Sequence, residues 1–197
     1  MTRNSSRNIS LVHLALFMLL IVAVAALRVL PHPPNFSPVS ALALFGGAYL
    51  TRPILKSFWG RFSLALLLPL ASLFLSDLVL GFHGQMASVY ASFVLVSLLG
   101  FMALERRTPL RIGVSVVSGS LIFFAVTNLT VWAEGALYAR TFSGLMASYV
   151  AGLPFLENSV LGDLFFSTIL FGVWGWLDNR VVSSTHVDSI ITLKEVR

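Results

Sequence analysis

Long apolar runs, separated by short polar or basic stretches, dominate the pattern of the chain. They predict membrane-spanning helices, because about 20 apolar residues in a helix cross the hydrocarbon core of a bilayer. The predicted spans are residues 11–30, 38–51, 62–80, 86–104, 112–132 and 160–177. This pattern indicates an all-α polytopic membrane protein, with a six-helix bundle as a single domain over residues 1–177 and a polar tail over residues 178–197.

A proline-dense break, Pro-His-Pro-Pro-Asn-Phe-Ser-Pro at residues 31–38, separates the first two spans. Its prolines cannot continue a helix, because each lacks an amide hydrogen and disfavours the α conformation in the residue before it. Ser37 is expected to cap a second helix that begins at Pro38. That helix would be only about 21 Å long, which is too short for a hydrocarbon core of about 30 Å. The break is therefore expected to enter the membrane as irregular chain, buried in protein or beside a polar cavity.

Residues 135–158, between the fifth and sixth spans, form a second unusual segment. Its apolar side chains recur at helical spacing, while small side chains fill the opposite face. The segment is therefore predicted to be an amphipathic helix on the outer side, ended by Gly152-Leu153-Pro154. Two placements remain open: the helix rests along the membrane interface, or it folds over the mouth of the bundle.

Composition and charge support the membrane assignment and give an orientation. The chain is 57% apolar and 11% charged, which is typical of a polytopic membrane protein. If the spans alternate, nearly all basic residues fall on one face, and only Arg28 and Arg140 fall on the other. Because basic loops stay cytoplasmic, both termini are predicted to be cytoplasmic, and the net charge of +5 needs no nucleic-acid partner.

Polar and aromatic side chains gather in the outer half of the predicted bundle. Those inside spans should face its interior, because polar groups are costly in hydrocarbon. The candidate ligand-binding residues are His32, Asn35, Phe36, Asp77, His83, Tyr90, Asn128, Trp132 and Asp163.

The two acidic residues among these candidates are predicted to sit at opposite ends of their helices. Asp77 lies near the C-terminal end of its helix, where the dipole disfavours a carboxylate, so it needs a donor, and Arg28 is well placed to supply one. Either a structural ion pair between these two residues or a ligand contact satisfies this requirement. Asp163 is predicted near the N-terminus of the sixth span, where the dipole favours a negative charge.

Catalytic and metal chemistry have weaker support in the sequence. His32 and His83, with Asp77 or Asp163, supply the nitrogen and oxygen atoms that zinc accepts, but their spacing is unspecific, so no metal site is assigned. No spacing of nucleophile, base and orienting acid resembles a catalytic triad, and the chain has no cysteine to act as nucleophile. We therefore do not expect an enzyme, and no cofactor is indicated.

Several short blocks of the chain carry a resemblance to a known group of proteins. These blocks are Pro34-Asn35-Phe36-Ser37-Pro38-Val39, Ala43-Leu44-Phe45-Gly46-Gly47-Ala48, Leu75-Ser76-Asp77, Leu80-Gly81-Phe82-His83, Thr127-Asn128 with Trp132, and Gly152-Leu153-Pro154-Phe155. Over roughly residues 31–177 the chain resembles an uncharacterised family of small bacterial inner-membrane proteins. That family in turn resembles the S components of energy-coupling-factor vitamin transporters, most closely the cobalamin type.

The second resemblance implies a binding protein of the bacterial inner membrane that takes a small vitamin-like or cofactor-like molecule, such as a corrinoid, from the outer side. Two features of the S components are missing. The first span lacks their Ala-x-x-x-Ala docking pattern, and the chain lacks the cysteine that the cobalamin type uses at cobalt. The alternative hypothesis is an accessory subunit of a larger membrane complex, in which the same polar residues fasten helices and protein partners cover the surface.

Overall fold

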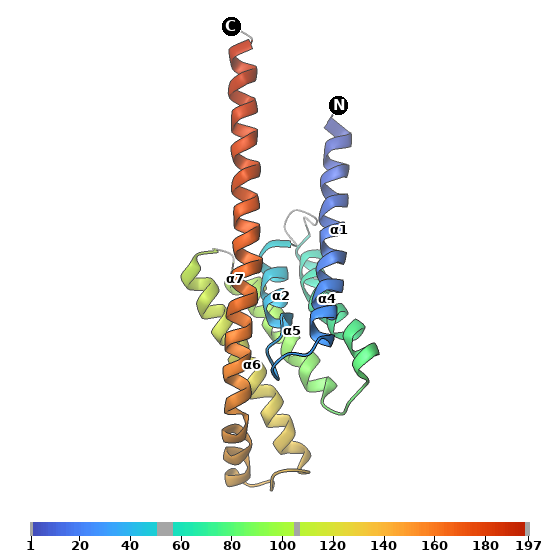
Figure 1. The fold of residues 1–197 in the computed structure, drawn as a ribbon, viewed down its shortest axis with the longest axis vertical. Coiled ribbons are helices and arrows are strands. Elements are labelled where there is room, and N and C mark those ends of the chain that lie inside the picture. The colour runs from blue at the N-terminus through green and yellow to red at the C-terminus, as the bar shows by residue number, and fades with distance from the viewer. Residues whose placement is uncertain (1, 51–56, 105–106, 196–197) are drawn as a thin grey trace.

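The computed structural model describes residues 2–50, 57–104 and 107–195, with side chains for residues 15–48, 57–104 and 107–176. The elements in chain order are α1 (Thr2–Val29), α2 (Val39–Phe45), the π-helical turn η1 (Gly46–Leu50), α4 (Phe58–Leu80), α5 (Met86–Ala103), α6 (Pro109–Glu134) and α7 (Phe142–Glu195). No strand occurs in these described ranges, and the prediction of an all-α fold is confirmed. The N-terminal end of α1 and the C-terminal end of α7 lie at the same end of the molecule (Figure 1).

Within the described residues, four helical segments are long and apolar enough to cross a bilayer: α4, α5, α6 and Phe142–Trp176 of α7. Two shorter apolar helical segments, Ala15–Val29 and Val39–Ala48, fall where the first two spans are predicted. The chain is therefore a polytopic membrane protein. A total of six crossings stays a prediction.

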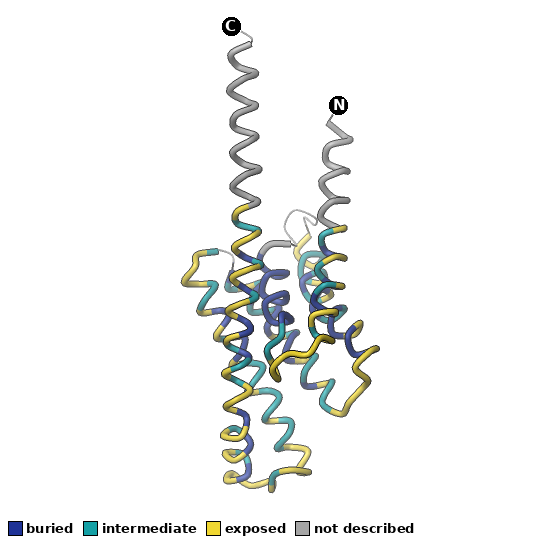
Figure 2. Tube along the Cα trace, in the orientation of Figure 1, coloured by how far each residue is buried: buried dark blue, intermediate teal, exposed yellow. Residues whose placement is uncertain are grey.

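The short helix α2 lies at the centre of the bundle. It packs against α1, α4, α5, α6 and α7, so the other described helices surround it. All seven of its side chains are buried, and the exposed fraction of Leu42, Ala43 and Leu44 is 0%. Figure 2 shows this segment as a buried rod, while the proline break that leads into it is exposed. The shortest helix is thus the one that the longer helices share as their core.

Glycine residues allow α2 and η1 to pack closely against α5. A Cβ atom added at Gly100 of α5 would lie 2.7 Å from the Cα atom of Leu44, and one added at Gly47 would lie 2.9 Å from the carbonyl carbon of Gly100. Both distances are too short for real atoms, and the neighbours are backbone rather than side chains that can rotate away. Small residues at such positions drive helix association in membranes, because lipid is as apolar as the protein and close packing decides the contact.

The helices α6 and α7 form an antiparallel hairpin that extends beyond the other helices, at the end away from the termini (Figure 1). Two side chains near the start of α7 hold the N-terminal part of this helix against the backbone of α6. Ser148 Oγ donates to the carbonyl oxygen of Asn128 at 3.0 Å, and Tyr149 Oη donates to that of Ala125 at 3.0 Å. The predicted amphipathic segment, residues 135–158, therefore comprises the turn of this hairpin and the first part of α7.

Two predicted helix boundaries are wrong. The helix expected to end at residues 152–154 continues, because α7 runs through Pro154 from Phe142 to Glu195 and includes the predicted sixth span and tail. A proline is tolerated inside a membrane helix because neighbouring groups can satisfy the freed carbonyl, while Gly152 serves close packing on Asn128. The second helix begins at Val39 rather than Pro38, and Ser37 Oγ accepts only a long 3.5 Å hydrogen bond from the Val39 amide.

Candidate functional site

The proline break is held in one shape by its own turn and by α7. The amide of Phe36 donates to the carbonyl oxygen of Pro33 at 3.0 Å, and Asn35 between them has a φ of 64°, in the left-handed region. Asn158 Nδ2 of α7 donates to the carbonyl oxygen of Pro34 at 3.0 Å. A Cβ at Gly162 of α7 would lie 3.1 Å from the Cα atom of Phe36, so the two backbones nearly touch. The break is thus an ordered wall rather than a loose linker.

Phe36 and His32 extend from this wall in different ways. The ring of Phe36 packs against Phe165 and Phe166 of α7, with centroids 6.0 and 5.6 Å away. His32 is exposed, and its Nδ1 lies 2.6 Å from the carbonyl oxygen of Leu30. Phe36 therefore fastens the break to α7, while His32 contacts the backbone at the end of the first helix.

Asp77, Arg28 and Tyr90 form a polar cluster between three helices. Arg28 Nη1, near the end of α1, forms an ion pair with Asp77 Oδ1 and donates to Ser76 Oγ at 2.5 Å. Tyr90 Oη of α5 donates to the other carboxylate oxygen, Oδ2, at 2.9 Å. The Asp77 side chain is 1% exposed and that of Arg28 is 17% exposed. The structural ion pair anticipated from the sequence is present, and it ties α1, α4 and α5 together.

A cavity of about 390 Å³, the break cavity, lies beside this cluster. Three residues that carry nitrogen donors line it, namely Arg28, His32 and His83, together with Asn35 of the break. Hydroxyl and apolar side chains complete the wall: Ser37, Val39, Ser40, Leu80, Val89, Phe93, Phe123 and Ser159. The cavity therefore combines hydrogen-bond donors, among them Arg28 in its ion pair with Asp77, with apolar surface.

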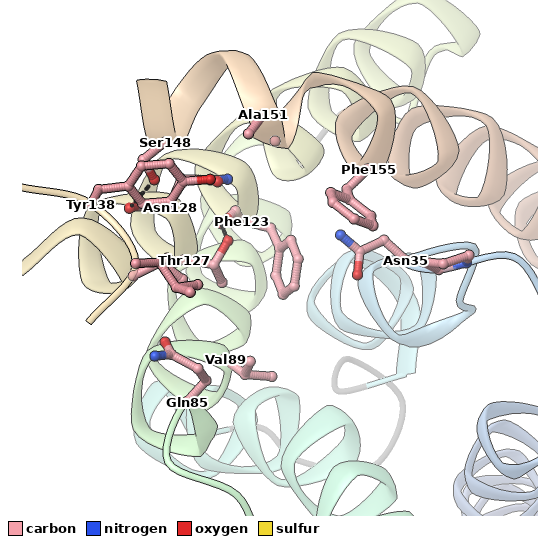
Figure 3. Close-up of a pocket in the computed structure, with 14 residues that line it drawn as sticks. Asn35, Gln85, Val89, Phe123, Thr127, Asn128, Tyr138, Ser148, Ala151 and Phe155 are labelled. Carbon is pink, nitrogen blue, oxygen red and sulfur yellow. Dashed lines mark hydrogen bonds between the residues drawn. The ribbon is translucent and has the colours of Figure 1, made fainter. Parts of the chain in front are cut away.

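A second cavity of about 390 Å³, the hairpin cavity, lies between the break, α5 and the α6–α7 hairpin (Figure 3). It shares Asn35, Val89 and Phe123 with the break cavity, so the two cavities adjoin. Its other lining residues are Pro34, Gln85, Thr127, Asn128, Val131, Leu137, Tyr138, Ser148, Ala151, Gly152 and Phe155. In Figure 3, Asn35 and Tyr138 lie on opposite sides, with Phe123 and Phe155 nearer Asn35. The lining of the hairpin cavity thus contains both aromatic rings and amide or hydroxyl groups.

Hydrogen bonds brace the rim of the hairpin cavity. The indole Nε1 of Trp132 donates to the carbonyl oxygens of Ala139 and Thr141, at 3.1 Å each, which holds the turn between α6 and α7. Gln85 Nε2, before α5, donates to a carboxylate oxygen of Glu134 at the end of α6. Trp132 is therefore a brace for the turn and does not line either cavity.

Asp163 lies elsewhere than the sequence predicts. It was expected near a helix N-terminus, but α7 begins at Phe142, so Asp163 lies deep within the helix. Its side chain is 2% exposed and accepts a 2.7 Å hydrogen bond from Ser120 Oγ of α6, and Ser40 of α2 is a second hydroxyl partner. The favourable helix dipole expected for this carboxyl group is therefore not available to it.

The predicted site residues consequently fall into three groups. His32, Asn35, His83 and Asn128 line the two cavities. Asp77 and Tyr90 form the polar cluster beside the break cavity, whereas Phe36, Trp132 and Asp163 make packing or hydrogen-bond contacts outside the linings. Among the residues that the structure describes, no group of three or more His, Asp or Glu side chains is arranged to hold a metal ion.

Several lining residues were missed by sequence reasoning, namely Val89, Phe123, Thr127 and Phe155. Thr127 and Phe155 belong to blocks that mark the family resemblance, so a signal was present for them. Val89 and Phe123 gave none, because a side chain that faces a cavity is as apolar as one that faces lipid.

A family model covers almost the whole of this arrangement, since it matches residues 8–186. The chain belongs to DUF6580, a family of unknown function. No curated protein and no solved structure matches the chain. The DUF6580 match includes the break, the polar cluster and both cavities, so these features lie within the part of the chain that defines the family.

Proposed function

We propose that this DUF6580 protein is a membrane-embedded binding protein of the S-component type, which takes a small vitamin-like or cofactor-like molecule from the outer side of a bacterial inner membrane. The observation that carries the proposal is the pair of adjoining cavities at the proline break, which share Asn35, Val89 and Phe123. Ligand sites are concave, mostly apolar and marked by a few convergent polar groups, and cavities of this size fall within their usual range.

The linings favour a molecule with two chemically different ends. Arg28, His32 and His83 at the break cavity suit an anionic or hydrogen-bond-accepting group, because guanidinium and imidazole groups donate hydrogen bonds. The rings of Phe123, Tyr138 and Phe155 in the hairpin cavity suit a planar or apolar body, and amide groups there add orientation. A corrinoid and a flavin are candidates with this combination.

Native mass spectrometry of the protein extracted in mild detergent tests the proposal. We expect the isolated chain to retain a small molecule, or to bind one of the probes hydroxocobalamin and riboflavin with a rise in melting temperature. A chain that carries no small molecule and binds no probe would contradict the proposal.

A matched pair of variants then tests the site. In Asn35→Gly the side chain shared by both cavities is removed, while glycine still accepts the φ of 64° without strain. We expect weaker ligand retention in this variant at an unchanged melting temperature. The control is Gly113→Ala on α6, where an added Cβ meets no atom within 4 Å and which does not line either cavity. Equal retention in wild type and Asn35→Gly would remove the break from the site.

A specific observation also supports the alternative of an accessory subunit. The α6–α7 hairpin exposes large apolar side chains, including Leu137 (78% exposed), Phe142 (76%) and Val150 (65%). Lipid covers such side chains in an isolated chain, and a partner protein in the membrane would cover them in a complex. The same mass spectra distinguish the two proposals, because stoichiometric protein partners without a bound small molecule favour the subunit.

A further inference from the structure

Asp163 is a buried carboxyl group with no cationic side chain beside it among the residues that the structure describes. The helices packed against its part of α7 are α2 and α6. The described side chains of α2 include no titratable group, and α6 carries only Arg111 and Glu134, which lie near its two ends and are exposed. Across the break cavity are Arg28, His32 and His83, of which Arg28 is engaged by Asp77. The groups that touch the carboxyl are the hydroxyls of Ser120 and Ser40.

An isolated carboxylate at 2% exposure within a membrane bundle is costly, because transfer of an unpaired charge out of water is strongly unfavourable. A protonated carboxylic acid avoids that cost and has one O–H donor together with acceptor oxygen. The two serine hydroxyls match it, since each can both donate and accept. Ser120 Oγ donates to Asp163 Oδ2 at 2.7 Å. The lone pairs on the oxygen atoms of Ser120 and Ser40 remain available as acceptors for the acid proton.

Asp163 lies in a row of serine hydroxyl groups that connects two cavities. Ser40 lines the break cavity, as does Ser159, which precedes Asp163 by about one helical turn on α7. Ser167 follows Asp163 at the same spacing, is 2% exposed, and its Oγ is buried with no hydrogen-bond partner among the described residues. Ser167 lines a further cavity of about 580 Å³ between α6 and α7. One face of α7 thus carries Ser159, Asp163 and Ser167 in succession, between two cavities.

We propose that Asp163 is a proton-binding site inside the bundle, which holds a proton as a neutral carboxylic acid and exchanges it with the break cavity through Ser40. In this reversible exchange, the Asp163 carboxylate takes a proton from hydronium in the cavity to form the neutral acid, and the acid gives the proton back to water in the cavity. The site does not depend on a ligand in the cavities. It gives the chain a buried group whose charge can change, which is the feature that proton-linked membrane proteins use.

Infrared difference spectroscopy of the full-length protein tests this proposal. We expect the wild type at neutral pH to show the carbonyl stretch of a protonated carboxylic acid, and Asp163→Asn to lose that band. Asp77→Asn is the control and should keep the band, because the Asp77 carboxylate is paired with Arg28. If Asp163→Asn does not fold, Asp163→Glu should still show the band at a shifted frequency and so assign it.

Access is measured by transfer of the folded protein into D₂O. The band should shift as the proton is replaced by deuterium, and Ser40→Ala should slow that shift relative to wild type. Three results would overturn the proposal. These are no acid band in the wild type, a band that does not shift in D₂O, and a band that disappears on addition of sodium chloride at constant pH, which would make the site a cation site.

Discussion

The pairing of Arg28 with Asp77 shows how much a single buried residue depends on its neighbours. Asp77 lies near the C-terminal end of α4, where the helix dipole opposes a negative charge, and its side chain is 1% exposed. Arg28 and Tyr90 supply the compensating contacts to its two oxygens. The carboxylate therefore joins α1 to α5 through α4, and its removal affects three helices at once.

We expect Asp77→Ala to lower the free energy of unfolding by about 3 kcal/mol, because it leaves Arg28 and Tyr90 without their acceptor. Equilibrium unfolding in mixed detergent micelles measures the loss. The double variant Arg28→Met with Asp77→Leu removes both charges and should recover much of the stability. An Asp77→Ala variant as stable as the wild type would show that the ion pair contributes nothing to the fold.

Sequence reasoning could reach this pair but not the environment of Asp163. The dipole at a helix end demands a donor for Asp77, and Arg28 stands at the C-terminal end of the first predicted span, on the same side of the bundle. For Asp163 the same reasoning failed because it depends on where the helix begins, and α7 begins at Phe142 rather than near residue 160. The serine partners Ser40 and Ser120 lie on other helices, and serine is too common in the chain to predict such a meeting.

At the scale of the element, α2 illustrates what hydrophobicity does not reveal. The sequence predicts a short apolar helix after a proline break, and the structure contains one at Val39–Phe45. Its position at the centre of the bundle was not predictable, because side chains facing lipid and side chains facing protein are equally apolar. The small residues in the run, such as Gly47, were the available signal, since close backbone contact requires them.

We expect Gly100→Ala to destabilise the bundle by about 1–3 kcal/mol, because the new methyl group would overlap the Leu44 backbone and force α2 and α5 apart. Thermal unfolding in detergent measures this effect. Gly113→Ala, on the open side of α6, makes the same chemical change and should leave stability nearly unchanged. Equal melting temperatures for the two variants would contradict the tight contact.

In the long helix α7, a clear local signal in the sequence is overridden by tertiary contacts. A Gly-Leu-Pro sequence normally marks the end of a helix, yet α7 passes through Pro154. Its outer part is held against α6 by Ser148 and Tyr149 on one side of the proline, and it packs on the break through Gly162 on the other. Tertiary contacts on both sides therefore override the local preference, and one-dimensional pattern reasoning cannot include such contacts.

At the scale of the whole molecule, the two cavities lie on the side of the bundle away from the N-terminal end of α1 and the C-terminal end of α7 (Figure 1). The break, the start of α5 and the α6–α7 hairpin come together there, although they are far apart in the sequence. Residue spacing and charge sorting predicted that these segments share one side, and their meeting around one cavity follows from the way α7 packs on both the break and α6. The orientation of this side in the membrane remains a prediction.

Single cysteines test the predicted orientation directly, because the natural chain has none. We expect Ala136→Cys, in the exposed turn between α6 and α7, to react with a membrane-impermeant maleimide on intact spheroplasts. Thr108→Cys, exposed at the start of α6, should react only after the membrane is made permeable. The cysteine-free parent is the control. Labelling of residue 108 but not residue 136 on intact spheroplasts would reverse the assigned topology.

The central position of α2 also determines the order in which the protein can assemble. The ribosome delivers α2 before α4, α5, α6 and α7, which are the helices that later enclose it. When it emerges, α2 has only α1 beside it, and it is too short to settle across a bilayer alone. The packing of α2 in the centre of the bundle is therefore completed late, when α7 packs against α2 and against the break. A nascent chain stopped before α7 leaves the side of α2 that faces α7 uncovered, so the burial of α2 is completed only when α7 is in place.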